Sequence, residues 1–261
     1  MTLRLGGVPF GVGAPLICGM AEDPDIDLLA IAPRQLVKPL RSGLLEAALV
    51  SSIEAFRQPG YRAVAGLGIA SRGPVRSVRA FLRHGCETCD IKTVGIDESS
   101  ETSVALLKIL LSQRLGNPDC SFERIVPNMH PDEMPHDLVM MIGDHGLAAD
   151  AGKRRVLDLG EQWQSWTGLP FVYALWLIGP GINNPENIVP ILRRAHKEGL
   201  RRGVTDGTSG AVHYEISDLD LRGLERFRDE AGKIGLADAT IELAFIGNQP
   251  KNSTQEKETS S

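Results

Sequence analysis

The chain has 261 residues, of which 42% are hydrophobic and 23% charged, a composition typical of a globular protein with ample apolar material for a core. It has 28 basic and 33 acidic side chains, a net charge of −5 and no basic block, which argues against nucleic acid and membrane surfaces as partners. No stretch approaches the ~20 apolar residues of a membrane span, and residues 1–20 are too broken by glycine and proline for a signal peptide, so we expect a cytoplasmic protein.

The first third of the chain alternates strand and helix signals. Short apolar stretches predict strands, and amphipathic stretches that begin at a serine or end at a glycine predict helices. In chain order we expect a strand at 3–8, a glycine-rich turn and a short helix from Pro15, a strand at 26–32, a helix at 34–43, a strand at 46–50, a helix at 51–58, and two strands at 61–71 and 75–83 that pair across the turn at 72–74.

A second unit of the same kind follows and then returns to the first. We expect a strand at 93–97, a buried helix at 104–116, strands at 121–126, 137–144, 154–160 and 171–179, helices at 185–202 and 219–235, and a closing strand at 241–246. This alternation predicts α/β lobes with helices on mixed, mostly parallel sheets. The order predicts a bilobal, periplasmic-binding-protein-like fold of type II with a ligand cleft between its lobes. Residues 1–92 and 171–250 would form lobe one, 93–170 lobe two, and 251–261 a disordered tail.

All three tryptophans, Trp163, Trp166 and Trp176, lie within residues 157–176. Trp163 and Trp166 are spaced i, i+3 and share one face of a predicted helix, for which core packing is the default interpretation. The stretch covers the predicted return from lobe two to lobe one. We therefore expect these aromatic residues to pack where the lobes join, with one or two of them lining the cleft.

Three turns rich in Ser and Thr, at 48–54, 73–78 and 95–107, stand near strand ends and helix starts. Hydroxyls at a helix N-terminus lie beside unpaired backbone N–H groups and the positive end of the helix dipole, and together these can hold a carboxylate without a lysine. Ordinary capping explains any one such turn. Two of them on different lobes favour a shared site for a small anion.

Other polar residues are weaker candidates. Asp144 follows an apolar strand, where α/β clefts bind ligands, although it also suits a helix N-cap. His145 beside it could donate to an anion or act as acid or base. Cys86 and Cys89 form a lone C-x-x-C in a polar turn, which favours surface thiols over a zinc or redox site. The sequence lacks local signatures of nucleophilic catalysis, nucleotide binding and metal binding, and it leaves the catalytic groups unknown.

The stretches "DLGEQWQSWTGLPFVYALW", "GIASRGPVRSV", "SSETSVALLKILL" and "MMIGD" resemble the chorismate dehydratases of the futalosine route to menaquinone. The resemblance runs from Arg4 to about Phe245. It implies the bilobal fold, a cytosolic lyase without metal or organic cofactor, and removal of water from chorismate to give 3-[(1-carboxyvinyl)oxy]benzoate. Carried over by position, it implies substrate-binding roles for Ser52, Ser77, Ser100, Thr102, Ser103 and Asp144.

The chain departs from the family at one position that matters. The family usually has Ser-Tyr-Leu-Asn before its first helix, whereas this chain has "PFGV", so Val12 replaces an asparagine expected to face the reacting groups. A backbone N–H of the Gly11–Gly13 turn, or His145, could substitute as donor. The alternatives are a non-catalytic binding protein for an aromatic or enolpyruvyl carboxylate and the related naphthoate synthase of the same route. A homodimer is left open.

Overall fold

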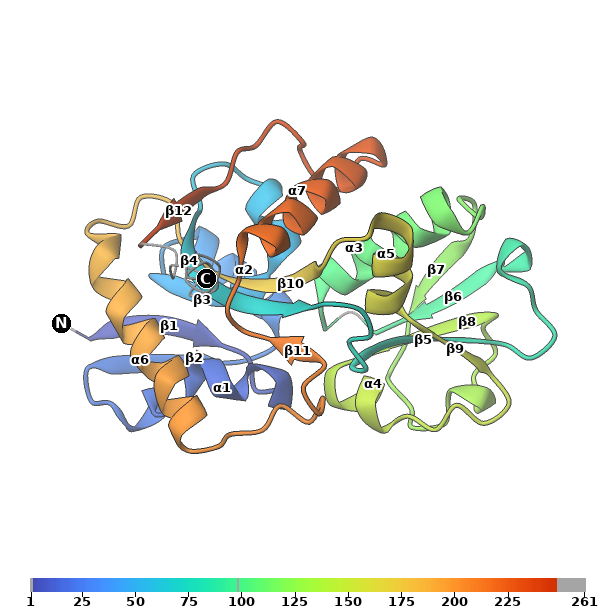
Figure 1. Ribbon diagram of the computed structural model, residues 1–261, viewed down its shortest axis with the longest axis horizontal. Coiled ribbons are helices and arrows are strands. Elements are labelled where there is room, and N and C mark those ends of the chain that lie inside the picture. The colour runs from blue at the N-terminus through green and yellow to red at the C-terminus, as the bar shows by residue number, and fades with distance from the viewer. Residues whose placement is uncertain (1, 98, 248–261) are drawn as a thin grey trace, which may run out of the picture.

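The computed structural model describes residues 2–97 and 99–247, which form two α/β lobes lying side by side along the long axis of the molecule (Figure 1). The predicted bilobal α/β fold is confirmed, with one mixed sheet in each lobe. The predicted tail at 251–261 lies outside the described residues. None of the helices in the described ranges is both long and apolar enough to cross a membrane.

Strands from both ends of the chain build the first sheet, in the order β11-β4-β10-β3-β1-β2, with β12 also on β4. β1 runs parallel to β2 and β3, whereas β10 runs antiparallel to β3 and β4. The strands are β1 (Leu3–Gly7), β2 (Ile26–Ala30), β3 (Ala47–Ser51), β4 (Arg62–Ser71), β10 (Phe171–Ile178), β11 (Val212–His213) and β12 (Ala244–Ile246).

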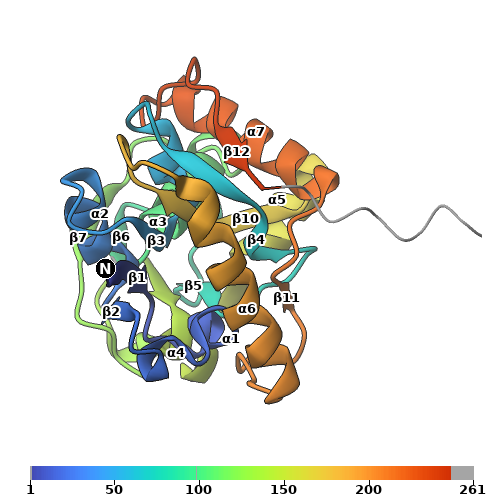
Figure 2. The same cartoon turned by 90° about the vertical axis from the view of Figure 1, so that its left-hand side faces the viewer.

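Helices of the first lobe pack on this sheet and on one another. α2 packs on β3, α7 packs on β10, and α1 packs against α6, which lies across the near side of the lobe in Figure 2. Pro stands within the first two positions of α1 and α2, where its missing N–H costs nothing. The helices are α1 (Ala14–Ile17), α2 (Pro33–Arg41), α6 (Ile188–Arg201) and α7 (Asp218–Lys233).

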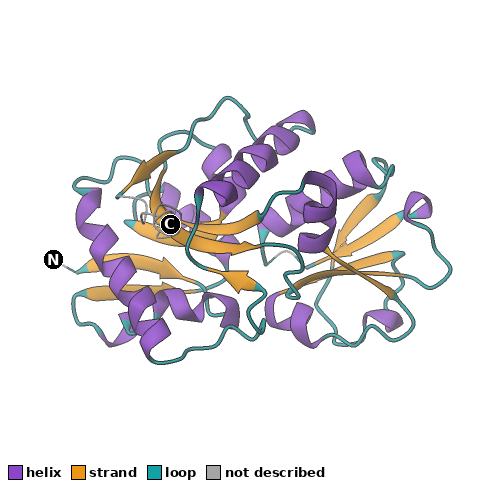
Figure 3. Ribbon diagram, viewed as in Figure 1, coloured by secondary structure: helices purple, strands orange, loops and turns teal. Residues whose placement is uncertain are grey.

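The second sheet has the order β7-β6-β8-β5-β9 and forms the other lobe (Figure 3). β6 is parallel to β7 and β8, and β5 is antiparallel to β8 and β9. Its strands are β5 (Val78–Leu82), β6 (Thr93–Ile96), β7 (Ser121–Arg124), β8 (Leu138–Ile142) and β9 (Arg155–Asp158), and its helices are α3 (Glu101–Ile109), α4 (Gly143–Ala148) and α5 (Leu159–Thr167).

The pairing of β5 differs from the sequence-based expectation. We expected 75–83 to pair with 61–71 inside lobe one, but β5 pairs with β8 and β9 in the second sheet. The Asp158 carboxylate accepts the backbone N–H groups of Val75 (2.9 Å) and Arg76 (2.7 Å), and Gly73 has a φ of 104°. These contacts turn the chain away from β4. The chain therefore first crosses from lobe one to lobe two at residues 72–77. The expected lobe boundary at 92–93 is wrong, because β5 precedes it and already belongs to the second sheet.

The aromatic stretch joins the lobes by packing. Trp163 of α5 is fully buried, with its ring centroid 5.2 Å from Phe171 of β10 and 6.4 Å from Phe227 of α7. Its Nε1–H donates to the carbonyl of Pro170 at 3.1 Å. Edge-to-face contacts of this kind contribute about 0.5–1.5 kcal/mol beyond the burial of apolar area. The cluster fixes how α5 of the second lobe meets β10 and α7 of the first.

Candidate functional site

A narrow cleft lies between the two lobes. Its walls come from β3, β4, β10 and the first turn of lobe one, and from the start of β5, the end of β8 and the start of α3 in lobe two. Most of its lining is apolar, including Val8, Phe10, Val12, Ile69, Val75 and Ile142. The polar contribution comes chiefly from Ser51, Ser77, Ser100 and Ser103. Within the described chain, no lining residue carries a charge.

The cleft is also nearly closed. Its volume is only about 60 Å³, well below the roughly 300–1,000 Å³ usual for ligand pockets. On one side Ser51 of β3 faces Ser100 before α3, with the hydroxyl oxygens 3.4 Å apart. On another, α4 meets the Gly11–Gly13 turn. A ring compound can therefore enter only when the lobes part.

Three serines form one polar end of the cleft. Ser100 is the N-cap of α3, and its Oγ accepts from the backbone N–H (3.4 Å) and the hydroxyl (3.2 Å) of Ser103. Ser51 Oγ adds a third hydroxyl to this group. These hydroxyls stand at the N-terminus of a nine-residue helix, where the dipole and the unpaired N–H groups stabilise negative charge. This end of the cleft can hold a carboxylate.

Ser77 marks a second polar end. It immediately precedes β5, and Gly143 immediately follows β8; because Val78 pairs with Ile142, both lie at the same end of the sheet. The guanidinium of Arg79 holds α4 there by donating to the carbonyls of Leu147 and Ala149, both at 3.1 Å. Ser77 thus lines the cleft next to β5, and Ser100 and Ser103 line it beyond β6. β8 separates these two strands in the sheet, and most of the remaining lining is apolar.

Ser52 and Thr102 lie behind the cleft rather than in its lining. Both are fully buried, and Ser52 Oγ donates to the carbonyl of Val172 at 2.7 Å. Thr102 Oγ1 accepts the N–H of Ile53 at 3.1 Å, and the two hydroxyl oxygens are 3.3 Å apart. They tie α3 to the first lobe, so protein groups already occupy their hydrogen bonds.

Asp144 and His145 are exposed on α4 at the rim of the cleft and are not part of its lining. Asp144 Oδ1 lies 3.4 Å from the position that a β-carbon on Gly11 would occupy, so the carboxylate stands beside the first turn. Gly11 itself is near this rim and also outside the lining. Of the residues expected to bind substrate, the structure therefore brings Ser77, Ser100 and Ser103 into the cleft.

The turn that carries Val12 is held from behind. The Tyr214 hydroxyl lies 3.0 Å from the carbonyl of Val12 and 2.9 Å from the carboxylate of Asp206, either of which can accept its proton. Burial raises the pKa of Tyr214, and the neighbouring Asp206 carboxylate raises it further. Gly13 packs directly on Val8, where a β-carbon would clash. These contacts hold the backbone of the turn from which Val12 lines the cleft.

The sequence does not single out two contributors to the cleft and its support: Ser51 and Tyr214. Ser51 lies in the hydroxyl-rich turn at 48–54, but two adjacent serines give no indication of which one faces the cleft. Tyr173 comes from the aromatic stretch and supplies the aromatic lining that we expected from it. Tyr214 lies 202 residues from Val12 in sequence, and no local pattern connects them.

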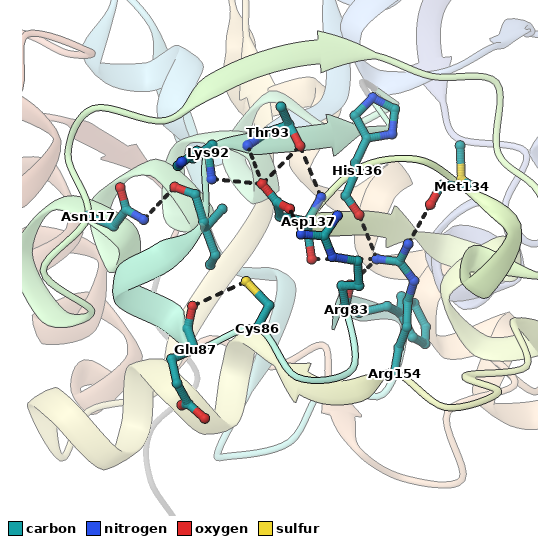
Figure 4. Close-up of polar contacts among 12 residues, drawn as sticks. Arg83, Cys86, Glu87, Lys92, Thr93, Asn117, Met134, His136, Asp137 and Arg154 are labelled. Carbon is teal, nitrogen blue, oxygen red and sulfur yellow. Dashed lines mark hydrogen bonds and ion pairs between the residues drawn. The ribbon is translucent and has the colours of Figure 1, made fainter.

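The opposite end of the second sheet is densely polar (Figure 4). Asp137 accepts the N–H groups of Lys92 and Thr93, both at 2.9 Å, and pairs with Arg83 at 2.6 Å. Arg154 is buried and donates to backbone carbonyls, among them that of His136 at 2.9 Å. No part of this network reaches the cleft lining.

The cysteines near this end are free thiols. Cys86 is half-buried and Cys89 exposed. Burial raises the pKa of the Cys86 thiol, which disfavours its reactive thiolate form. Among residues 2–97 and 99–247, no group of three or more His, Cys, Asp or Glu side chains could hold a metal ion.

The fold is shared with periplasmic-binding proteins. A protein of Archaeoglobus fulgidus superposes with a TM-score of 0.64 at 15% identity, covering 90% of this chain and 98% of that one. A Candida albicans protein described as having the generic periplasmic binding protein fold gives 0.58 at 10% identity over 96% and 99%. The alkanesulfonate-binding protein of Xanthomonas axonopodis pv. citri, bound to MOPS, gives 0.55 at 15% identity over 90% and 94%. The chain is thus a bilobal protein of this fold.

The sequence comparisons define the family within that fold. Residues 3–211 match the pattern of the menaquinone biosynthesis family. The chorismate dehydratase of Thermus thermophilus is 31% identical over 239 residues, which cover 78% of this chain and 86% of that protein. The chain belongs to the menaquinone biosynthesis family, and the resemblance inferred from the quoted stretches is confirmed.

Proposed function

We propose that the protein is a chorismate dehydratase, a carbon–oxygen lyase that converts chorismate to 3-[(1-carboxyvinyl)oxy]benzoate in the cytoplasm. The observation that carries this proposal is the uncharged cleft between the lobes, which is lined mostly by apolar residues and by serine hydroxyls from β3, the start of β5 and the start of α3. Membership of the menaquinone biosynthesis family and the identity to the Thermus thermophilus enzyme support the same reaction.

Chorismate is a small ring compound with two carboxylates. One carboxylate would lie at the N-terminus of α3 against Ser51, Ser100 and Ser103, and the other near Ser77 at the end of β5. Hydroxyl and backbone N–H donors hold such groups without a cationic side chain. The fold accommodates small anions of this kind, since the alkanesulfonate-binding relative holds the sulfonate MOPS.

The reaction breaks the C4–O bond and the C3–H bond of chorismate. The electron pair of the C–H bond completes the aromatic ring, the proton passes to a base, and the hydroxyl leaves as water after gaining a proton. Aromatisation drives this step, so the protein needs mainly to position the ring and polarise the leaving group. Apolar walls formed by Val75, Ile69 and Ile142 exclude water and so strengthen each remaining polar contact.

Asp144 and His145 are the candidate groups for proton transfer. Both are exposed at the rim, and Asp144 lies beside the turn that carries Val12. A proton can reach them from the cleft through a water molecule or after a small movement of α4, which begins at Gly143 in the cleft wall.

A second candidate function has one specific observation in its favour. Val12 lines the cleft where the family usually places an asparagine, and valine cannot donate a hydrogen bond. Removal of one preorganised donor at a reacting centre typically costs about 10²–10³ in rate. A protein that binds an aromatic or enolpyruvyl carboxylate without turnover would have this substitution, whereas nothing specific favours a naphthoate synthase.

Incubation of the purified protein with chorismate tests the proposal directly. We expect absorbance and mass spectrometry to show the loss of one water and the appearance of the benzoate product. Calorimetry with chorismate, run in parallel, separates the alternatives. Binding without water loss would establish the binding protein, and absence of both would reject chorismate as the ligand.

A further inference from the structure

A second groove, separate from the cleft, lies along α2 beside the junction of the lobes. Arg34, Lys38 and Arg41 stand at i, i+4 and i+7 on α2 and therefore form one stripe along the helix. Arg57, just after the 3₁₀ turn Ser52–Phe56, lines the groove as well. The groove is open and has a volume of about 680 Å³. None of its lining residues is shared with the cleft.

Two carboxylates are already engaged in this groove. Glu54 is buried and accepts both Nε (2.7 Å) and Nη2 (2.8 Å) of Arg41, as well as the hydroxyl of Tyr61 at 2.7 Å. Hydrogen bonding to Glu54 raises the pKa of Arg41. Arg41 is thus a fixed cation that cannot swing away, and its remaining N–H donors are the ones available to a ligand.

Glu101 is shared between two arginines. Its Oε2 accepts from Arg57 Nη1 at 3.0 Å, and its Oε1 lies 3.2 Å from Arg34 Nε. Glu101 opens α3, which follows β6 of the second lobe, whereas Arg34 and Arg57 belong to the first. The pairing is therefore a tie between the lobes. All three side chains are between a fifth and two-fifths exposed, so an anion from solvent can compete for the arginines.

Lys38 adds a cation that the protein leaves available. Its side chain is exposed, and across the described ranges 2–97 and 99–247 its ammonium group has no ion pair or hydrogen bond. An ammonium group and several arginine N–H donors facing one groove match a compact anion with many oxygens. Phosphate groups have this chemistry, because their oxygens accept paired N–H donors from arginine.

We propose that this groove binds a compact polyanion of the phosphate class, held by Lys38, Arg41 and Arg57. The ligand competes with Glu101 for Arg57 and so releases part of the tie between the lobes. Free pyrophosphate and a phosphate monoester both present phosphate oxygens to these donors. They differ in the number of charged oxygens, so their relative affinities distinguish them. The groove shares no lining residue with the cleft, and the proposal does not rest on the reaction proposed for the cleft.

Calorimetric titration of the full chain with pyrophosphate tests the proposal, with glycerol phosphate as the monoester and acetate as the monoanion. We expect saturable binding of pyrophosphate that weakens as NaCl rises, and a weaker response to glycerol phosphate. Lys38→Ala should weaken pyrophosphate binding about fivefold to tenfold. Lys197→Ala removes the same charge from an exposed site on α6 and should leave the affinity unchanged.

Glu101→Gln supplies a test of opposite sign. Because glutamine keeps the shape of the side chain but removes its charge, the competitor for Arg57 is weakened and pyrophosphate should bind several-fold tighter. Circular dichroism establishes that each variant is folded. Absence of saturable pyrophosphate binding, equal affinities of Lys38→Ala and Lys197→Ala, or weaker binding by Glu101→Gln would each overturn the proposal.

Discussion

The two ends of the second sheet use polar groups in opposite ways. At the far end, the buried Asp137 and Arg154 are bonded to backbone groups, and Asp137 also pairs with Arg83 (Figure 4). At the cleft end the lining is uncharged, and its polar groups are small hydroxyls such as those of Ser77 and Ser100. The far end therefore uses charged side chains to bind backbone groups of the protein itself, whereas the cleft end presents small hydroxyl groups to a ligand.

This difference predicts a separation of stability from ligand binding. A buried carboxylate that accepts several N–H groups is costly to remove, because the donors lose their partner and remain buried. A serine hydroxyl that lines a cleft can be exchanged for water at little cost to the fold. Variants at the far end should therefore change the free energy of unfolding, and variants at the cleft should change affinity or turnover.

Asp137→Ala should have the largest effect. The substitution leaves the N–H groups of Lys92 and Thr93 without their acceptor and Arg83 without its partner, so we expect a loss of about 3 kcal/mol in unfolding free energy. Urea unfolding measures it, and chorismate affinity should not change. Asp119→Ala, at an exposed aspartate, is the control. If Asp137→Ala changed the affinity for chorismate but left the unfolding free energy unaltered, the far end would serve ligand binding rather than stability.

Val12→Asn should have the next largest effect, on turnover alone. If the amide restores a donor that acts as the hydroxyl leaves, the rate should rise by about 10²-fold, while chorismate binding, which depends on the serines, stays within about twofold. Steady-state kinetics and calorimetry measure the two quantities. Val12→Ala removes the same side chain without adding a donor and should not raise the rate. Brisk turnover by the unaltered protein together with a slower Val12→Asn would mean that another group does this work.

The double variant Ser100→Ala/Ser103→Ala tests the carboxylate site at α3. Loss of hydroxyl donors to a charged group should weaken chorismate binding by about 1–3 kcal/mol. Ser52→Ala is the matched control, because its hydroxyl donates to the buried carbonyl of Val172 and does not line the cleft. It should cost about 1 kcal/mol of stability and little affinity. Equal chorismate affinities of the double variant and of Ser52→Ala would show that Ser100 and Ser103 support the start of α3 and do not bind the substrate.

These serines also mark how far the sequence could predict the site. The pattern of strand, hydroxyls and helix predicted that the turn before α3 would approach a cleft, and Ser100 and Ser103 do so. It could not separate them from Ser52 and Thr102, because a shift of one residue turns a side chain from the cleft to the interior. Which way each hydroxyl points depends on partners such as Val172, 120 residues away from Ser52.

The fold, like the site, could be predicted from the sequence in outline but not in every pairing. Alternating apolar and amphipathic stretches predicted two α/β lobes, and the improbable aromatic stretch predicted the joint that Trp163 and Phe171 form. The sheet to which β5 belongs was not predictable from local pattern. It depends on Asp158, which lies 83 residues from Val75 and fixes the passage between the lobes through backbone N–H groups.

The smallest expected effect concerns His196, a buried polar group of the first lobe behind the cleft. Its ring lies 5.7 Å from that of Tyr214, and its Nδ1 has no hydrogen-bond partner among the described residues. Burial lowers the pKa of His196 below its usual value of 6.5. Its proton is therefore bound less tightly in the folded chain than in the unfolded one.

The sign of the pH dependence follows from that difference. Above pH 6.5 both states carry neutral histidine and stability is complete, whereas below it the unfolded chain takes up a proton first and gains free energy. Stability should therefore fall from pH 7 towards pH 5 by at most about 1.4 kcal/mol for each unit between the two pKa values. His196→Leu should flatten this part of the profile in urea unfolding, while the loss below pH 4 that depends on Asp137 stays. If His196→Leu leaves the slope of unfolding free energy against pH unchanged, His196 has the same pKa in the folded and unfolded chain. In that case the evidence that buried polar groups set stability separately from ligand binding would come from the second sheet alone.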